Sequence, residues 1–481
     1  MIRMFSKRHV FDAVSNPRNV ALVAVVLVSI FFCIWLIPPE SVTLQQAQAW
    51  ATIGMAGVLT FMILSSALVH HTILHSYILF LGCASLFIGG RYIAYAMGFD
   101  VAMLKMENNF FAVHRPDFVS IELTAYEGLR LTLYLVSCLL AMHAGYMVSL
   151  WKKPSRNADS QDMQWTTYLR IPALALAAVS ALAFMISFPD AYRAVHGSGY
   201  ISLYDSASTD FTTRGSTAAQ YGLLLALGLA FASQSKRLGW CILGLLAIYY
   251  TANLQLGVRG GIMGFALLCV WLFHIKVRRI DRLALLAIPL LLGGIVVLAA
   301  MGNRGIDFGE RTVMLLPWFI DNQGLTALYV HSALQIDHYP ALAYLHGVFP
   351  ITPALAALCG TSIPLDQLYF GQYLSKMALA GDAYQKGFGM GWSLFADFYA
   401  YTLWVPGAYL VAAAGFGALL ARLVNATHPL FFGAHVMVFV KLMLLPRTGL
   451  YSIIPFLLVY AAIVLTCHIC VHLLARRPGQ A

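Results

Sequence analysis

Long apolar runs, each of about 20 residues, alternate with polar segments along this whole chain. A helix of about 20 apolar residues crosses the roughly 30 Å of hydrocarbon in a bilayer. The pattern therefore predicts an all-α polytopic membrane protein with about twelve transmembrane helices. The predicted spans are 20–37, 48–69, 74–97, 130–151, 171–189, 218–234, 239–257, 261–275, 284–302, 392–420, 430–446 and 450–474.

The composition agrees with a membrane protein. Hydrophobic residues make up 60% of the 481 residues and charged residues only 10%, whereas soluble domains carry about 25% charged residues. The net charge of +10 is spread over loop ends, without the basic and aromatic groove that nucleic-acid-binding proteins show, so we expect no nucleic acid partner. The first apolar run ends in "IPPES" without a small-residue cleavage pattern, and we expect it to be retained as a span.

Positive charges mark one side of the predicted bundle as the cytoplasmic side. Lys and Arg favour cytoplasmic loops, and clusters of them fall in the loops on the side of the N-terminus. We therefore predict that both termini are cytoplasmic. The residues of this set are Arg3, Lys7, Arg8, Arg18, Lys152, Lys153, Arg156, Arg170, Lys236, Arg237, Lys276, Arg278, Arg279, Arg282, Arg422, Arg476 and Arg477.

One connection on the opposite side is far longer than the two to eight residues usual between bundle helices. It covers residues 303–391, between predicted helices 9 and 10, and includes the mixed apolar and aromatic stretch "LPWFIDNQGLTALYVHSALQ". Such a stretch is typical of amphipathic helices at a membrane interface. We accordingly divide the chain into helices 1 to 9 (1–302), a large outer loop with amphipathic helices (303–391) and helices 10 to 12 (392–481).

Several arginines stand at the predicted outer ends of spans, where the positive-inside bias disfavours them. A single one could snorkel to headgroups or close a local salt bridge. As a group they suggest an anionic ligand at this depth, and the planar guanidinium suits phosphate oxygens. In "LGVRGGIMG" the arginine sits in a tight glycine-flanked turn that permits close approach of a ligand. These arginines are Arg91, Arg130, Arg259, Arg304 and Arg447.

Other candidate polar groups lie on the same side. Asp397, in "GWSLFADFYAY", is our first candidate for a general base, because an acidic residue near the end of a span is a functional candidate by default. Asp321 and Gln323 follow in "WFIDNQG". His331, His338 and His346 could also accept protons, but their spacing shows no metal-ligand pattern, and we expect no metal.

Three stretches resemble Wzy-type O-antigen polymerases, also called oligosaccharide repeat-unit polymerases. "LQLGVRGGIMGFAL" is similar to the family's span that ends in a short Gly/Arg turn. "KGFGMGWSLFADFYAYTLWVPGAYLVAAAGFGALLARL" is similar to the glycine-rich segment after the large outer loop. "LLPRTGLYSIIPF" is similar to the family's arginine-containing turn before the last span. The layout, with a dominant outer loop late in the chain, agrees over almost the full length.

The resemblance implies a glycosyltransferase of the GT-C type at the periplasmic face of the bacterial inner membrane. It would move a growing glycan from undecaprenyl pyrophosphate to another lipid-linked repeat unit for O-antigen, capsule or exopolysaccharide. Asp397, Arg259 and Arg447 would carry the chemistry, without cofactor or metal. A chain-length-regulating co-polymerase is an implied partner. The expected substrate-binding residues are Arg304, Arg91, Arg214, Asp321, His331 and His346.

Two other functions fit parts of the sequence. An O-antigen ligase uses the same donor but transfers glycan to lipid A-core, and a loop histidine such as His331, His338 or His346 would serve it. A lipid-linked oligosaccharide flippase would be expected to show pseudo-symmetric halves. We find no repeat that relates the two halves of this chain, and residues 386–423 favour the polymerase.

Overall fold

The computed structural model describes most of the chain, and every regular element in the described part is a helix. The chain is therefore an all-helical polytopic membrane protein, as its hydropathy predicts. Structure is described for residues 15–36, 42–98, 123–151, 160–198, 210–256, 260–281, 315–349, 363–379, 384, 389–403, 405 and 407–475.

Seven helical segments within these ranges are long and apolar enough to cross a bilayer. They contain α2 (Pro17–Leu36), α3 (Leu44–His70), α7 (Ala125–Trp151), α8 (Arg170–Ser198), which follows the 3-10 helix η1 (Ser160–Leu169), α10 (Lys236–Gln255), α21 (Pro429–Leu444) and α22 (Ile454–Ala475). Three further helices have shorter apolar stretches: α9 (Asp210–Ala232), whose apolar stretch is Thr217–Ala232, α11 (Gly260–Lys276) and α20 (Ala408–Val424). The predicted span 284–302 lies outside the described residues.

Two predicted spans are not single straight helices. The segment predicted at 74–97 consists of α4 (Ser76–Phe87) and α5 (Gly90–Ala96), which are bent by 68°. The bend places α5 against α13 (Leu315–Gln323), and a Cβ at Gly90 would lie only 2.5 Å from Ile320 O. The segment predicted at 392–420 is also broken, into α19 (Leu394–Ala400) and α20. Hydropathy alone does not detect either break, because both halves of each segment are apolar.

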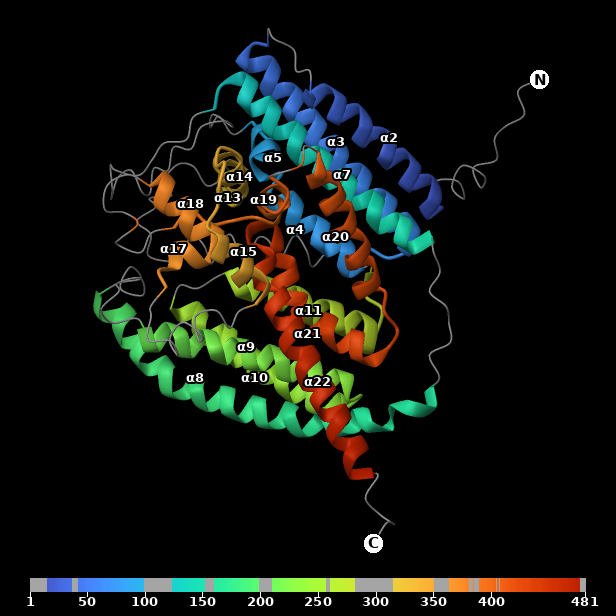
Figure 1. The fold of residues 1–481 in the computed structure, drawn as a ribbon, viewed down its shortest axis with the longest axis vertical. Coiled ribbons are helices and arrows are strands. Elements are labelled where there is room, and N and C mark those ends of the chain that lie inside the picture. Colours follow the sequence, from blue (N-terminus) through green and yellow to red (C-terminus); the bar gives the residue numbers. More distant parts are fainter. Residues whose placement is uncertain are drawn as a thin grey trace, which may run out of the picture.

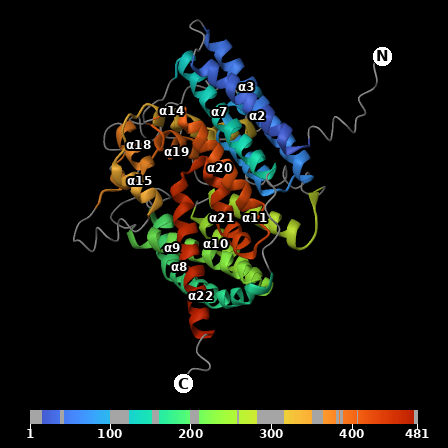
Figure 2. The same ribbon diagram turned by 45° about the vertical axis from the view of Figure 1, so that its right-hand side comes forward.

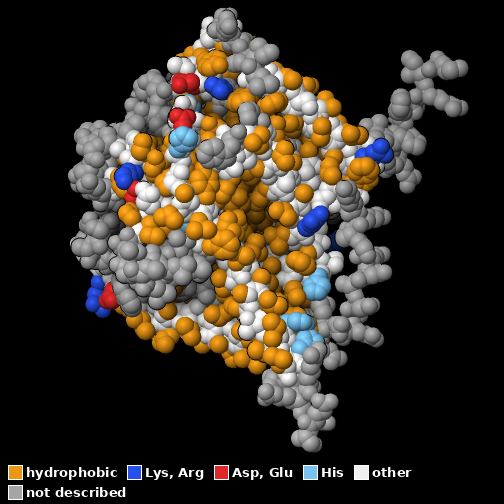
Figure 3. Space-filling view, in the orientation of Figure 1, with side chains coloured by type: hydrophobic (Ala, Val, Ile, Leu, Met, Phe, Trp, Pro, Cys, Tyr) orange, Lys and Arg blue, Asp and Glu red, His pale blue; other side chains and the backbone are white. Residues whose placement is uncertain are grey.

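The helices form two groups on either side of α21 (Figures 1 and 2). One group contains α2, α3, α4, α5, α7 and α20, and the other contains α8, α9, α10, α11 and α22. Helix α7 lies inside its group, with 94% of its apolar window buried, whereas only 11% of the α22 window is buried. The apolar side chains that cover the outer surface are therefore exposed to the bilayer (Figure 3).

Short helices of the large-loop region gather at one end of the bundle, at the left of Figure 1. They are α13, α14 (Thr326–Leu334), α15 (Ala341–Val348), α17 (Leu365–Leu368) and α18 (Phe370–Ala378). Helix α14 contacts α7, α18 and α19, while α15 contacts α17 and α22. This region is thus packed onto both helix groups, and α19 lies beneath it.

Glycines set the closest helix crossing. A Cβ at Gly417 of α20 would collide with Met142 O of α7, and a Cβ at Gly145 of α7 would collide with Ala414 O of α20. Small residues let helix backbones approach closely in lipid, where van der Waals packing drives association. The α7–α20 crossing holds α20 in place and so positions α19, which precedes it.

Candidate active site

Asp397 lies in α19 and is 1% exposed. The helix begins after Ser393, whose Oγ accepts a hydrogen bond from Phe395 N and donates one to Pro446 O at 2.7 Å. From α7, the Tyr134 hydroxyl donates to Phe395 O at 2.8 Å. These contacts fix α19 between α7 and the turn that follows α21.

That turn, residues 445–452, consists of the 3-10 helices η4 (Leu445–Arg447) and η5 (Leu450–Ser452) with Thr448 and Gly449 between them. Leu450 N donates a hydrogen bond to Asp397 Oδ2, and Trp392 Nε1 donates one to Asp397 Oδ1 at 2.7 Å. A Cβ at Gly449 would lie 2.8 Å from Asp397 Oδ2 and 2.7 Å from Trp392 Cδ1. Glycine at 449 therefore allows the turn to close over the carboxylate.

Burial raises the pKa of Asp397 to about 7, although the hydrogen bonds from Leu450 and Trp392 act in the opposite direction. Desolvation disfavours the charged carboxylate, and these two donors recover only part of the lost solvation. No ion pair joins Asp397 to a cation among the described residues. A carboxyl group with a pKa near neutrality can both take up and release a proton at physiological pH.

A small cavity adjoins Asp397. Its volume is about 10 Å³, close to the least that admits one water molecule. Three tyrosines line it, and tyrosine combines a flat apolar ring with a polar hydroxyl that can donate or accept. The lining residues are Ala343, Gly347, Leu368, Tyr369, Phe370, Asp397, Tyr401 and Tyr451.

His346 lies next to this cavity, between Gly347 and the ring of Tyr369. It is 5% exposed, and its ring meets the Tyr369 ring edge-on at 4.7 Å. Burial lowers its pKa, so the imidazole is neutral at neutral pH. Its Nδ1 has no hydrogen-bond partner within the described part of the chain. An unpartnered buried nitrogen beside a cavity could accept a proton from a ligand.

Arg447 is in the same turn as the Leu450 amide that contacts Asp397. Its side chain is exposed; Nη1 donates to Gln323 Oε1 at 3.0 Å, and the guanidinium lies 5.8 Å from the Phe87 ring centroid. No carboxylate pairs with Arg447 in the described residues. The turn that carries Arg447 is therefore the one whose Leu450 amide contacts Asp397. The roles predicted for these two residues stay predictions.

Arg91 has a partner inside the protein. It is 2% exposed, and its Nε lies 3.0 Å from Asp321 Oδ1, with Nη2 at 3.5 Å from Oδ2. Gly324 permits this contact between α5 and α13, because a Cβ there would lie 2.7 Å from the Arg91 side chain. Each of these two predicted binding residues therefore neutralises the other, and their pair fixes α5 against α13.

The other predicted residues are not gathered around the cavity in the described structure. His331 of α14 is half-buried; burial lowers its pKa, and nearby Glu127 of α7 partly opposes that shift. Arg259 and Arg304 lie outside the described residues, as does the side chain of Arg214. Their predicted roles remain predictions.

Sequence reasoning missed two residues that the structure makes prominent. Trp392 holds Asp397 through its indole N–H. Lys441 lies within the predicted span 430–446, and its Nζ donates to Gln220 Oε1 of α9 at 3.2 Å. A lysine inside an apolar span is a functional candidate by default, and this signal could have identified it.

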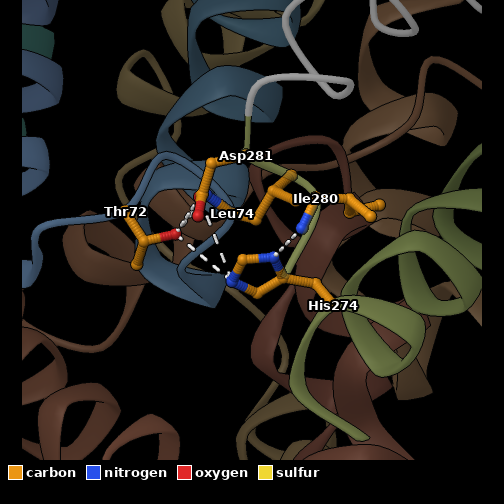
Figure 4. A network of polar contacts seen from close by, with 5 residues as sticks. All are labelled: Thr72, Leu74, His274, Ile280 and Asp281. Atoms are coloured by element: carbon orange, nitrogen blue, oxygen red, sulfur yellow. Dashed lines mark hydrogen bonds and ion pairs between the residues drawn. The ribbon is translucent and has the colours of Figure 1, made fainter. Parts of the chain in front are cut away.

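A different polar cluster joins α11 to the loop between α3 and α4 (Figure 4). Thr72 Oγ1 donates to Asp281 Oδ1 at 2.5 Å, and His274 Nε2 lies 3.5 Å from Thr72 Oγ1 and 4.0 Å from Asp281 Oδ1. Ile280 N donates to His274 Nδ1 at 3.2 Å, so the ring proton is on Nε2 and faces Thr72 and Asp281. All of these polar groups are satisfied by one another, which indicates a structural link.

The family of the chain follows from comparison with known proteins. The family model for O-antigen polysaccharide polymerase Wzy matches residues 20–477 of the 481. The chain therefore belongs to this family, which confirms the resemblance seen in the three sequence stretches. No curated protein and no solved structure matches the chain. Family membership and the apolar helices identify a multi-pass membrane enzyme that polymerises O-antigen repeat units.

Proposed function

We propose that this enzyme elongates undecaprenyl-pyrophosphate-linked glycans at the periplasmic face of the inner membrane. A hydroxyl at the non-reducing end of one lipid-linked repeat unit attacks the anomeric carbon of the other glycan. A new glycosidic bond forms, and the bond between that carbon and the pyrophosphate breaks. The proton of the attacking hydroxyl passes to Asp397, and undecaprenyl pyrophosphate leaves.

The observation that carries this proposal is the environment of Asp397. The carboxylate is buried beside a cavity, has a pKa raised to about 7 and is held by two N–H donors in a fixed position. A general base works best when its pKa lies near the working pH and its position is fixed within hydrogen-bond reach of the proton. The cavity has room for about one water molecule, so it would admit the attacking hydroxyl, which the tyrosine hydroxyls at its wall could hydrogen-bond.

The leaving pyrophosphate gains negative charge as the bond breaks, and preorganised cations stabilise such charge. Arg447 is an exposed guanidinium without a carboxylate partner in the described structure, three residues before the amide that holds Asp397. It is the arginine best placed for this role. Arg259, Arg304 and Arg214 would assist it, whereas Arg91 would act indirectly because Asp321 already pairs with it.

The test replaces Asp397 with asparagine, which keeps the size of the side chain and removes its basicity. Glycan chain length is followed on gels in cells that lack the wild-type copy, with the amount of variant in the membrane measured in parallel. We expect Asp397→Asn to leave single-repeat glycan, a loss of at least about 100-fold in transfer rate.

Asp366→Asn is the matched control. Asp366 is also a buried aspartate, but it pairs with Lys376 at 2.7 Å and does not line the cavity. This variant should still polymerise. Normal glycan length with Asp397→Asn at wild-type abundance would refute the assignment and leave His346→Gln as the next base to test.

A further inference from the structure

Lys441 is a half-buried cation in the last turn of α21. Its Nζ donates to Gln220 Oε1 at 3.2 Å and lies 4.8 Å from the ring centroid of Tyr221, both on α9. Gln220 in turn donates through Nε2 to the Tyr250 hydroxyl of α10 at 3.0 Å. The ammonium group is therefore held by neutral groups only.

No ion pair joins Lys441 to a carboxylate in the described part of the chain. A charge in this position is costly without an anionic partner. Snorkelling to headgroups does not account for it, because the side chain is directed onto α9 and held there by Gln220. Tyr221, whose ring faces the ammonium, is 37% exposed, so this part of α9 is not enclosed within the bundle.

Arg447 lies in the turn that follows α21, and its side chain contacts helices on the other side of α21 from Lys441. Its contacts are Gln323 of α13 and Phe87 of α4, whereas Lys441 contacts α9. The packing of α21 agrees with this division: α9 and α11 contact it on one side, and α4 and α20 on the other (Figures 1 and 2). The outer end of α21 thus separates two cations that have no acidic partner in the described structure.

Both cations are connected through neighbouring residues to the segment that contacts Asp397. Arg447 belongs to the 445–452 turn that closes over Asp397. On the other side, the Tyr221 ring packs edge-on against Phe456 at 4.4 Å, just after Tyr451, which lines the cavity. The turn that carries Arg447 thus contacts Asp397, and the Tyr221 ring beneath Lys441 contacts α22, the helix that follows this turn.

We propose that Lys441 and Arg447 bind the diphosphates of two different lipid-linked substrates, one on each side of α21. This inference rests on the proposed function, in which two lipid-linked glycans meet and each carries its own diphosphate. Only one of the two diphosphates leaves, so both substrates must be held by their lipid ends while their sugars reach Asp397. Two separated cations meet that requirement, and a single diphosphate site does not.

The experiment uses the purified full-length enzyme in phosphatidylcholine vesicles with two substrates that have fixed roles. The donor is a repeat unit on undecaprenyl pyrophosphate whose attacking hydroxyl is methylated. In the acceptor, a phosphonate replaces the phosphate ester that joins the lipid diphosphate to the sugar, so that this bond cannot be cleaved. Because Arg447 is assigned to the leaving pyrophosphate, we expect Arg447→Gln to raise the KM for the donor by about tenfold or more. We expect Lys441→Gln to raise the KM for the acceptor by a similar factor.

Lys276→Gln is the matched control, because Lys276 lies 4.1 Å from the Phe432 ring of α21 at the opposite end of that helix. Both KM values should stay unchanged in this variant. A Lys441→Gln enzyme with wild-type KM for both substrates, or one in which both variants raise the same KM, would overturn the inference. If Lys441 bound only an anionic phospholipid headgroup, Lys441→Gln would have no effect in phosphatidylcholine, which counts against the inference as well. Failure of the wild-type enzyme to join the two substrates would instead overturn the proposed function.

Discussion

At the scale of single residues, Asp397 combines three features that are rarely compatible. Its carboxyl group is ionisable but buried, it has no cationic partner in the described structure, and it accepts hydrogen bonds from two N–H donors. Its pKa of about 7 in the folded protein lies above the ordinary value of 3.8. The stability that this group contributes is therefore complete below pH about 4 and is lost as the pH rises through 7.

The same pKa predicts the pH dependence of polymerisation. Since the base must be ionised, kcat/KM should rise about tenfold between pH 6 and pH 8, with a midpoint near 7. Trp392→Phe removes a hydrogen bond that favours the charged form, so it should move the midpoint to higher pH. The control is Tyr339, whose ring packs on Trp392 but whose hydroxyl donates to Ala333 O. Tyr339→Phe should leave the midpoint unchanged. A flat profile, or a midpoint that falls in Trp392→Phe, would contradict this account of Asp397.

At the scale of helices, breaks matter as much as spans. The bend between α4 and α5 places Arg91 within ion-pair distance of Asp321. The break between α19 and α20 lets α19 take a different direction from α20, with Asp397 buried. Straight helices through these segments would direct both side chains elsewhere. The α7–α20 crossing then fixes the position of the broken segment through its glycines.

Glycine substitutions in α20 test that crossing. Gly417→Ala should destabilise the protein by about 1–3 kcal/mol, because the added methyl collides with Met142 O. Gly415→Ala, two residues earlier on the open side of the same helix, meets nothing within 4 Å and should be neutral or slightly stabilising. Thermal unfolding of the two purified variants in detergent measures the difference. Equal unfolding temperatures would show that close packing at Gly417 is not required.

At the scale of the whole molecule, the candidate chemistry is asymmetric. The Asp397 cavity, Arg447 and Lys441 lie toward one end of the bundle, where the short helices of the large-loop region pack. The first turn of α11 lies beside Gln220, the partner of Lys441. Lys276 and the Thr72–His274–Asp281 cluster lie at the other end of α11. The positive-inside bias predicts that this second end is cytoplasmic and that the end with the candidate site faces the periplasm.

Cysteine labelling tests this orientation. In a variant with its eight cysteines replaced, Asp337→Cys and Lys236→Cys each introduce a single thiol at an exposed position. A membrane-impermeant maleimide applied to intact cells with a permeabilised outer membrane should label residue 337 and not residue 236. After lysis it should label both. Labelling of residue 236 in intact cells would reverse the predicted orientation.

The sequence by itself determined the fold class, the positions of most helices and the family. Hydropathy is a local property that can be summed over a window, and bilayer thickness sets the length of that window. Asp397 and Arg447 could be proposed as site residues for the same reason, since a charged side chain near an apolar run is recognisable in the sequence whatever the tertiary structure.

Only the tertiary structure decided the partner of each charge. Arg91 and Asp321 are 230 residues apart in the chain, yet they neutralise each other across α5 and α13. Lys441 faces neutral groups on α9, and Asp397 is held by an amide 53 positions later. Whether a charge is paired, free or buried depends on which distant segments pack beside it, and no local pattern contains that information.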